Sequence, residues 1–390
     1  MKKFISILGS TGSVGQSTLS IIDKKKNFFI PYIFSANKNY NLITKQIIKY
    51  KPKIFIIKDK KTFVRVRKNF TKSKTKLINS YDLLKIKKKS DITITAIPGI
   101  AGLEPTIKFI KYSEKVLIAN KESIICGWEL ISKTAFKNKT KIIPVDSEHY
   151  SILKLIENQK ISSIKKIYIT ASGGPFLNFK YNQLKKIKPA QALKHPKWKM
   201  GKKITIDSST LMNKIFELSE AQKLFNLPKN KIDILIHPNS LVHAILELNN
   251  GLKQFIFHET SMKIPLANAI FDGEIDIKTI LKKRKLANFE NLIFKKVDKK
   301  IFPLISLKNK INQFSSTPII VNAVNEILVD QFLKHKLPFL EINRIIMIIL
   351  KDKNYKKYAI KKPRNINQIY LIDLWARSVT KQILKKLRNV

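Results

Sequence analysis

The feature that most constrains the fold is an alternation of short β-rich apolar runs with longer amphipathic stretches over about the first 145 residues. The apolar runs predict strands at residues 4–8, 29–34, 54–57, 91–97, 116–119 and 142–145. Helix-like periodicity covers residues 18–23, 42–50, 103–110 and 123–136. This order predicts an α/β domain over residues 1–146, a Rossmann-like doubly wound parallel sheet that binds its ligand at the carboxyl ends of the strands.

After residue 146 the regular alternation of strand and helix patterns ends. A chain of 390 residues is also longer than one hydrophobic core usually supports, so we expect further domains. Strand patterns at 164–170 and 232–236, with a hairpin over 242–257 around Asn249-Asn250-Gly251, predict an α+β catalytic and dimerisation domain over 147–277. Residues 278–316 are Lys-rich and weakly periodic, which indicates a connector. Residues 317–390 predict a C-terminal α-helical domain, punctuated by prolines.

The net charge of +49 invites interpretation as a nucleic-acid-binding protein, because a basic surface gains affinity for phosphate backbones. The basic residues are nearly all Lys and are scattered along the chain, whereas nucleic-acid-binding proteins usually concentrate Arg and aromatic residues on one element. The excess of Lys accompanies an excess of Ile and Asn, as AT-rich codons produce. We interpret the charge as a solvated surface and expect no specific nucleic-acid partner.

The single cysteine, Cys126, excludes an intramolecular disulfide and fits a reducing compartment, so we expect a cytoplasmic protein. The longest apolar runs, such as residues 345–350, are too short to span a bilayer, and no membrane partner is expected. The N-terminus has two lysines and an apolar run, as a signal peptide does. That run, residues 4–8, is shorter than an h-region, and a first strand is the better interpretation.

A glycine-rich turn follows the first predicted strand and leads directly into a helix. Its spacing, G-x-x-G-x-x-G from Gly9 to Gly15, lets backbone amides and the helix N-terminus bind a pyrophosphate. The alternative is a plain tight turn. At the end of the second strand no carboxylate is present and Lys38 is, which favours NADPH over NADH, although Lys is common throughout this chain.

Two carboxylates follow the last strand of the first domain. Asp146 and Glu148 stand at i and i+2, and on an extended segment they point the same way. Two oxygen ligands suit Mg²⁺ or Mn²⁺ better than Zn²⁺, and the six histidines show no zinc spacing. The alternative is a solvated loop.

The segment 207–217 predicts a helix capped at Asp207 or Ser208. On a helix Asn213 and Lys214 lie on the same face as Glu217, at i+4 and i+3 spacing. Ser208, Asn213 and Lys214 can then hold a phosphate while Glu217 offers a third oxygen ligand to the metal. The alternative is the polar face of an ordinary amphipathic helix.

Two loops add weaker signals. Ser172 precedes Gly173-Gly174 after a predicted strand and offers anion contacts, although a glycine turn alone is the bland alternative. His195 and Trp198 belong to a loop that can close over a ligand and exclude water, although a lone His or Trp is more often structural.

Together these motifs resemble the 1-deoxy-D-xylulose 5-phosphate reductoisomerase family. The matching motifs run in order along nearly the whole chain: GSTGSVG from Gly9, NKES from Asn120, PVDSEH from Pro144, SGGPF from Ser172, HPKWKMGKK from His195, DSSTLMNK from Asp207 on through Glu217, and HPNS from His237. The C-terminal helices match weakly outside residues 322–326. One departure is Asn37, where the family usually has Gly before the basic residue.

The resemblance implies a homodimeric enzyme that converts 1-deoxy-D-xylulose 5-phosphate to 2-C-methyl-D-erythritol 4-phosphate, the committed step of non-mevalonate isoprenoid synthesis. It implies NADPH and a divalent metal ion, Mg²⁺ or Mn²⁺, with Co²⁺ as a substitute. The alternatives are another NADP-linked dehydrogenase acting on a small phosphorylated substrate, and a nucleic-acid-binding protein without enzyme activity.

The resemblance also assigns residues to each role. The metal ligands and catalytic carboxylates would be Asp146, Glu148 and Glu217, with Lys121 as a catalytic cation. Substrate contacts would come from Lys121, Ser147, Glu148, Ser172, His195, Ser208, Asn213, Lys214 and Glu217. NADPH contacts would come from Thr11, Gly12, Ser13, Val14, Lys38, Asn39, Asn120, Glu122 and Gly201, and a lid would contain Trp198 and Met200.

Overall fold

The computed structural model describes residues 2–86, 88–198, 200–281 and 292–388. The chain forms two compact units. Unit 1 comprises residues 1–123, 129–150 and 261–286, and unit 2 comprises residues 124–128, 151–260 and 287–390. Within the described ranges, no helix has both the length and the apolar character needed to cross a membrane.

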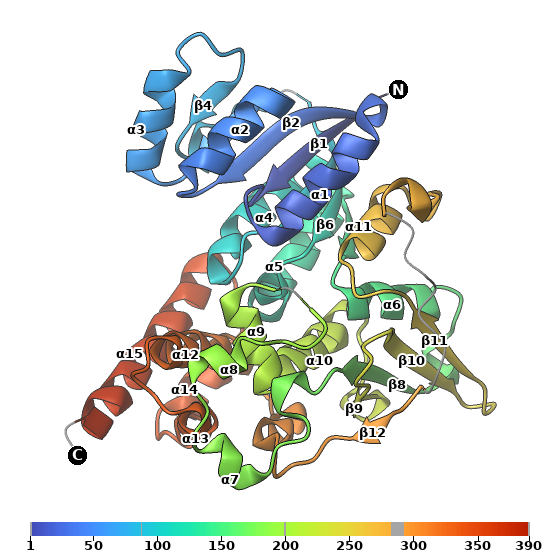
Figure 1. The fold of residues 1–390 in the computed structure, drawn as a ribbon, viewed down its shortest axis with the longest axis vertical. Coiled ribbons are helices and arrows are strands. Elements are labelled where there is room, and N and C mark those ends of the chain that lie inside the picture. Colours follow the sequence, from blue (N-terminus) through green and yellow to red (C-terminus); the bar gives the residue numbers. More distant parts are fainter. Residues whose placement is uncertain (1, 87, 199, 282–291, 389–390) are drawn as a thin grey trace. The chain divides into compact units, whose positions relative to one another are not determined.

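Unit 1 is built on a seven-stranded sheet whose strands all run parallel (Figure 1). Its strands are β1 (Lys3–Leu8), β2 (Phe29–Ala36), β3 (Ile54–Ile57), β4 (Lys76–Ile78), β5 (Ser90–Thr95), β6 (Ser113–Ile118) and β7 (Lys141–Pro144). The order β4-β3-β2-β1-β5-β6-β7 reverses direction at β1. The predicted doubly wound sheet is confirmed, and its switch point lies between β1 and β5, where such sheets bind ligands.

The helices of this half of the chain include α1 (Ser13–Lys24), α2 (Tyr40–Tyr50), α3 (Lys60–Asn69) and α4 (Leu103–Ile110). Two more, α5 (Lys121–Asn138) and α6 (Ser147–Ile156), cross the division between the units, and α11 (Lys263–Ile270) returns to unit 1. The sequence prediction missed α3 and β4. Half of α3 is Lys or Arg, β4 has only three residues, and each element buries a single side chain, so neither shows a clear apolar period.

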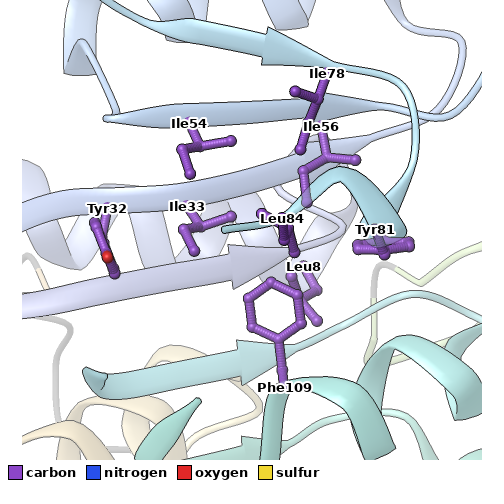
Figure 2. Packing of buried hydrophobic residues seen from close by; sticks show 9 residues of the cluster. All are labelled: Leu8, Tyr32, Ile33, Ile54, Ile56, Ile78, Tyr81, Leu84 and Phe109. Atoms are coloured by element: carbon purple, nitrogen blue, oxygen red, sulfur yellow. The ribbon is translucent and has the colours of Figure 1, made fainter. Parts of the chain in front are cut away.

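A cluster of buried side chains packs on one part of the sheet of unit 1 (Figure 2). Its strand residues are Leu8, Tyr32, Ile33, Ile54, Ile56 and Ile78, and it is completed by Tyr81, Leu84 and Phe109. Phe109, from α4, meets the Tyr81 ring edge-on with centroids 6.1 Å apart. Burial of each large aliphatic side chain stabilises the fold by roughly 1.5–3 kcal/mol.

Unit 2 contains a mixed five-stranded sheet of order β11-β10-β8-β9-β12. Its strands are β8 (Ile164–Ala171), β9 (Ile232–Ile236), β10 (Val242–Leu248), β11 (Lys253–Phe257) and β12 (Lys295–Lys296). The predicted hairpin is confirmed as β10 and β11, joined at Gly251 with φ 89°. The short β12 lies in the predicted connector, whose residues 282–291 are outside the described part.

The helices of unit 2 include α7 (Tyr181–Leu184), α8 (Pro189–Ala192), α9 (Lys202–Ser209) and α10 (Met212–Leu224). The C-terminal residues form α12 (Thr317–Leu333), α13 (Phe339–Ile349), α14 (Tyr355–Ala359) and α15 (Ile366–Arg388), which confirms the predicted helical character (Figure 1). Helix α12 packs against both α15 and α9, and this contact brings the C-terminal helices next to a candidate substrate-binding segment.

Two local predictions are wrong. Residues 145–149 are not an extended segment: β7 ends at Pro144 and α6 begins at Ser147. The backbone oxygen of Asp146, just before the helix, accepts a hydrogen bond from Tyr150 N at 2.9 Å. An acidic residue in the first helical turn, here Glu148, is a known start signal that the extended interpretation overlooked.

The segment 207–217 is not one helix. Helix α9 ends at Ser209 and α10 begins at Met212, because Leu211 adopts a left-handed conformation with φ 67°. This conformation costs a bulky residue roughly 1–2 kcal/mol, and it usually marks Gly or Asn. Nothing in the local sequence signals it.

Candidate functional site

The glycine-rich turn follows β1 at the switch point of the sheet. Gly9 has φ 85°, and a Cβ there would lie 2.7 Å from the carbonyl oxygen of Ala96, after β5. A Cβ on Gly15 would collide with the carbonyl oxygen of Gly9. Gly12, the N-cap of α1, supplies no side chain to cap the helix. The turn therefore requires glycine and leaves the N-terminal amides of α1 without a side-chain cap, as a site that binds a pyrophosphate needs.

Buried side chains fix this turn from behind. Gln46, on α2, accepts a hydrogen bond from Ser10 Oγ at 2.6 Å and donates one from its Nε2 to Ser10 O at 3.0 Å. The hydroxyl of Tyr81 donates to Ser35 Oγ at 3.0 Å, and Ser35 Oγ accepts from Gly9 N at 3.2 Å. Burial raises the pKa of Tyr81 to about 12, so this hydroxyl remains a donor.

The predicted NADPH contacts in unit 1 all follow strands of the parallel sheet. Thr11, Gly12, Ser13 and Val14 follow β1, and Lys38 and Asn39 follow β2. Lys38 is exposed, and Asn39 caps α2 by accepting a hydrogen bond from Leu42 N. Asn37 is absent from the described residues with positive φ, so the position does not require the glycine of the family.

Asn120 and Lys121 connect β6 to α5. Asn120 caps α5 by accepting a hydrogen bond from Ser123 N at 2.6 Å, and it donates to Gly99 O at 3.0 Å. The buried Nζ of Lys121 lies 2.8 Å from Oδ2 of Asp146, which follows the neighbouring strand β7. Glu122, the next residue, is buried in the first turn of α5.

The acidic motif after β7 is compact. Ser147 Oγ donates to Glu148 Oε2 at 2.6 Å, and Ser147 N donates to Asp146 Oδ1 at 3.1 Å. His149 is fully buried, with Nδ1 3.8 Å from Asp146 Oδ2. Unit 1 therefore brings Lys121, Asp146, Ser147 and Glu148 together at the carboxyl ends of β6 and β7.

In unit 2, Ser172 and His195 form a hydrogen-bonded pair. His195 Nε2 lies 3.0 Å from Ser172 Oγ, while Nδ1 accepts from the backbone N–H of Lys197 and of Trp198 at 3.2 and 2.9 Å. Because Nδ1 accepts, the neutral ring carries its proton on Nε2 and donates it to Ser172. Burial, and then the charge of Lys214, lower the pKa of His195 to about 4, so the ring is neutral near pH 7.

Asn213, Lys214 and Glu217 lie on one face of α10, at the spacing that the sequence predicts. Lys214 Nζ lies 2.7 Å from Glu217 Oε2, and Asn213 Nδ2 donates to Glu217 Oε1. Glu217 is only 1% exposed, so its carboxylate depends on these donors. The three residues form a buried group of one carboxylate, one ammonium and one amide.

Two glycines after β8 bring Ser172 close to Ser208. Gly173 and Gly174 have φ 80° and 61°, and a Cβ on Gly174 would lie 3.2 Å from Ser208 O. Gly174 N also donates to Ser172 Oγ at 3.0 Å. The turn after β8 therefore approaches the end of α9 and places Ser172 and His195 near Ser208. The charge of Lys214 lowers the pKa of His195, so the Lys214–Glu217–Asn213 group belongs to the same part of unit 2.

The predicted lid residues lie between α8 and α9. The Trp198 ring meets His243 edge-on with centroids 6.1 Å apart, and Met200 is half-buried. Gly201, the predicted NADPH contact of unit 2, is the N-cap of α9. Lys199 lies outside the described residues.

The sequence prediction assigned no functional role to several residues that hold these groups in place, and it gave Asp207 only as a possible helix cap, whereas Asp207 lies within α9. His149 and Asp207 stand inside recognised motifs, which could have drawn attention to them. Gln46 stands in an amphipathic helix, where nothing distinguishes it from a surface residue. Only its burial and its two bonds to Ser10 reveal it.

Known proteins match this chain over almost its whole length. A family model described as 1-deoxy-D-xylulose 5-phosphate reductoisomerase matches residues 5–127, and models of C-terminal domains of that enzyme match residues 142–225 and 258–379. The reductoisomerase of Pelagibacter ubique (strain HTCC1062) is 44% identical over 375 residues, covering 95% of this chain and 96% of the relative. That of Wolbachia pipientis subsp. Culex pipiens (strain wPip) is 37% identical over 391 residues, covering 99% and 98%.

Solved structures of reductoisomerases have the same fold. A crystal structure of DOX-P reductoisomerase in complex with NADPH, fosmidomycin and magnesium matches with a TM-score of 0.92 and 30% identity, covering 99% of each chain. The Zymomonas mobilis enzyme in complex with NADPH matches with a TM-score of 0.88 and 28% identity, covering 98% of this chain and 99% of that one.

Proposed function

This chain belongs to the 1-deoxy-D-xylulose 5-phosphate reductoisomerase family, and we propose that the side-chain groups of its two units together carry out the family's reaction. The reaction is the rearrangement and NADPH-dependent reduction of 1-deoxy-D-xylulose 5-phosphate to 2-C-methyl-D-erythritol 4-phosphate. Neither another NADP-linked dehydrogenase nor a nucleic-acid-binding protein is favoured, because the family matches extend over 95% of the chain.

The observation that carries the proposal is the group of polar side chains in unit 2. Ser172, Ser208 and Asn213 offer neutral donors, and Lys214 adds a positive charge, which is the combination that binds a phosphate. The neutral His195 donates to Ser172 Oγ, as does Gly174 N, so the Ser172 hydroxyl proton is directed outward to a ligand oxygen. This group would hold the phosphate and hydroxyls of the substrate.

The glycine-rich turn of unit 1 would hold NADPH. The tight approach of Gly9 to Ala96 and of Gly15 to Gly9 leaves no room for a side chain, as a cradle for a pyrophosphate requires. The residues assigned to this role are Thr11, Gly12, Ser13, Val14, Lys38, Asn39, Asn120, Glu122 and Gly201. Lys38, exposed after β2, would bind the ribose 2′-phosphate.

Asp146, Glu148 and Glu217 would hold the divalent metal ion. All three offer carboxylate oxygens, the ligands that Mg²⁺ and Mn²⁺ prefer. In each unit a lysine lies beside a carboxylate of the set, Lys121 at 2.8 Å from Asp146 and Lys214 at 2.7 Å from Glu217. These lysine ammonium groups partly neutralise the negative charge of the carboxylates, a charge that the metal ion would also neutralise.

Bound NADPH supplies the hydride, and the bound divalent ion polarises the substrate oxygens. Lys121 Nζ, held beside Asp146, would place a positive charge and a proton near the substrate carbonyl. Ser147 would orient Glu148 through their 2.6 Å hydrogen bond. Trp198 and Met200 would cover the bound substrate and exclude water.

A homodimer in the cytoplasm is the proposed setting. β11 is an edge strand of the five-stranded sheet, and the hairpin exposes Leu252 by 60% and Phe255 by 47%. An exposed apolar edge strand tends to pair with another chain, and a second copy of this chain would cover it.

The function is tested by following NADPH oxidation that depends on 1-deoxy-D-xylulose 5-phosphate, with and without a chelator. The wild-type protein should be active only with a divalent ion, Mg²⁺ or Mn²⁺, or Co²⁺ as a substitute. Glu217→Gln keeps the size of the side chain but weakens it as a metal ligand, so turnover should fall roughly 10²-fold or more. Unchanged turnover in the folded variant would remove Glu217 from the metal site.

A further inference from the structure

A buried carboxylate, Asp207, stands in the last turn of α9, next to Ser208. It is 1% exposed. Its Oδ2 lies 2.8 Å from Lys203 Nζ on the same helix, and its Oδ1 accepts a hydrogen bond from Asn325 Nδ2 at 2.7 Å. Asn325 is fully buried on α12, so this bond joins α9 to the C-terminal helices across 118 positions of sequence.

Only Thr210 and Leu211 separate α9 from α10. Helix α9 ends at Ser209, Leu211 is left-handed, and α10 begins at Met212. The Thr210 hydroxyl donates hydrogen bonds to the carbonyl oxygens of Ile206 and Asp207, which attach this turn to the end of α9. The position of α9 therefore sets the position of Ser208 and of the start of α10.

The chemistry of Asn325 fits a locating role. Its Oδ1 has no hydrogen-bond partner within the described ranges, so the donated bond to Asp207 is the polar contact that the side chain makes there. Lys203 already supplies a positive charge to Asp207. The Asn325 amide therefore adds no charge; its hydrogen bond holds the Asp207 carboxylate in a fixed position against α12.

We propose that Asn325 is a positioning residue for substrate binding: through Asp207 it holds Ser208, and the turn leading to Asn213 and Lys214, where they bind the substrate phosphate. This inference rests on the proposed function. The bond lies in the last turn of α9, beside Ser208, whereas the predicted NADPH contact of this helix, Gly201, is the N-cap at its other end. Loss of the bond should therefore affect the substrate phosphate more than NADPH.

The test compares Asn325→Leu with Asn322→Leu. Asn322 lies one turn earlier on α12, is also fully buried, and bonds to Glu326 on its own helix rather than to α9. Asn325→Leu should raise the KM for 1-deoxy-D-xylulose 5-phosphate about tenfold or more, because small displacements of binding groups are costly. The KM for NADPH should stay within about twofold, and Asn322→Leu should change neither, although both variants lower the melting temperature.

The exchange variant Asp207→Asn/Asn325→Asp tests the bond itself, because an amide at 207 can donate to a carboxylate at 325. It should restore the substrate KM toward the wild-type value, and it remains informative if Asn325→Leu does not fold. The inference would be overturned if folded Asn325→Leu kept the wild-type substrate KM or raised both KM values equally. It would also be overturned if Asn322→Leu had the same effect as Asn325→Leu, or if the exchange variant did not recover the substrate KM. Failure of the proposed function would instead appear as a wild-type protein that does not turn over the substrate.

Discussion

Replacing Gln46 by Leu should damage both the stability of unit 1 and its affinity for NADPH. Leu has nearly the volume of Gln but makes no hydrogen bonds. The variant therefore loses the bond from Ser10 Oγ, at 2.6 Å, and the bond to Ser10 O, at 3.0 Å. Ser10 is fully buried, so water cannot replace the lost partners.

The magnitude follows from the groups left without a partner. The Ser10 hydroxyl retains a weak contact with Ser35 O at 3.3 Å, whereas its carbonyl oxygen loses the bond from Gln46 outright. A buried polar group without a partner costs about 1–3 kcal/mol, so Gln46→Leu should lower the free energy of unfolding by roughly 2–4 kcal/mol. Because Ser10 stands between Gly9 and Gly12, the dissociation constant for NADPH should also rise, by about tenfold.

Urea unfolding and NADPH fluorescence titration measure the two effects. The double variant Ser10→Ala/Gln46→Leu removes the hydroxyl as well, so it should recover part of the lost stability, while the unpaired carbonyl oxygen keeps the rest. An exposed position on the same helix, Ile48→Ala, serves as the control, since Ile48 is 63% exposed. If Gln46→Leu matched the wild type in both measurements, the reasoning from Ser10 would be refuted.

Two further outcomes are expected. Phe109→Ala should lower the free energy of unfolding by about 3–5 kcal/mol in urea, whereas exposed Val64→Ala should change it by less than about 0.5 kcal/mol; equal effects would contradict the packing in Figure 2. Because the pKa of His195 falls from 6.5 to about 4 on folding, the unfolded chain binds more protons between these values, and stability should fall as pH drops from 6.5 toward 4. His195→Gln should flatten this part of the pH–stability curve, and an unchanged curve would argue against a buried neutral ring.

The fold was predictable wherever one element carries a clear period. The strands β3 and β9 and the helix α4 begin and end where the apolar pattern predicts, because buried parallel strands and amphipathic helices leave regular apolar spacing in the sequence. Helix α3 was missed because charged residues occupy half of its positions and only Val66 is buried. There the tertiary fold, not the local pattern, decides the structure.

In the candidate site, contacts between residues close in sequence were predictable, whereas features that depend on distant packing were not. The contact of Lys214 with Glu217 was predictable from i,i+3 spacing alone. The turn at Leu211 was not, because its left-handed conformation is imposed by the packing around a fully buried side chain rather than by the residue type.

The buried charges show why the most informative contacts lie beyond the reach of sequence patterns. A carboxylate can be buried only beside a charge or donor, and here Lys203 with Asp207 and Lys214 with Glu217 meet this need within one helix each. The pair of Lys121 with Asp146 depends instead on β6 and β7 being neighbours in the sheet, and the bond of Asn325 to Asp207 depends on α12 packing against α9. In a chain with 76 basic residues and only 27 acidic ones, the presence of a lysine predicts little, since nearly any carboxylate has one close in sequence. Burial of the acidic partner is therefore more informative than the presence of a nearby lysine, and burial is a property of the fold.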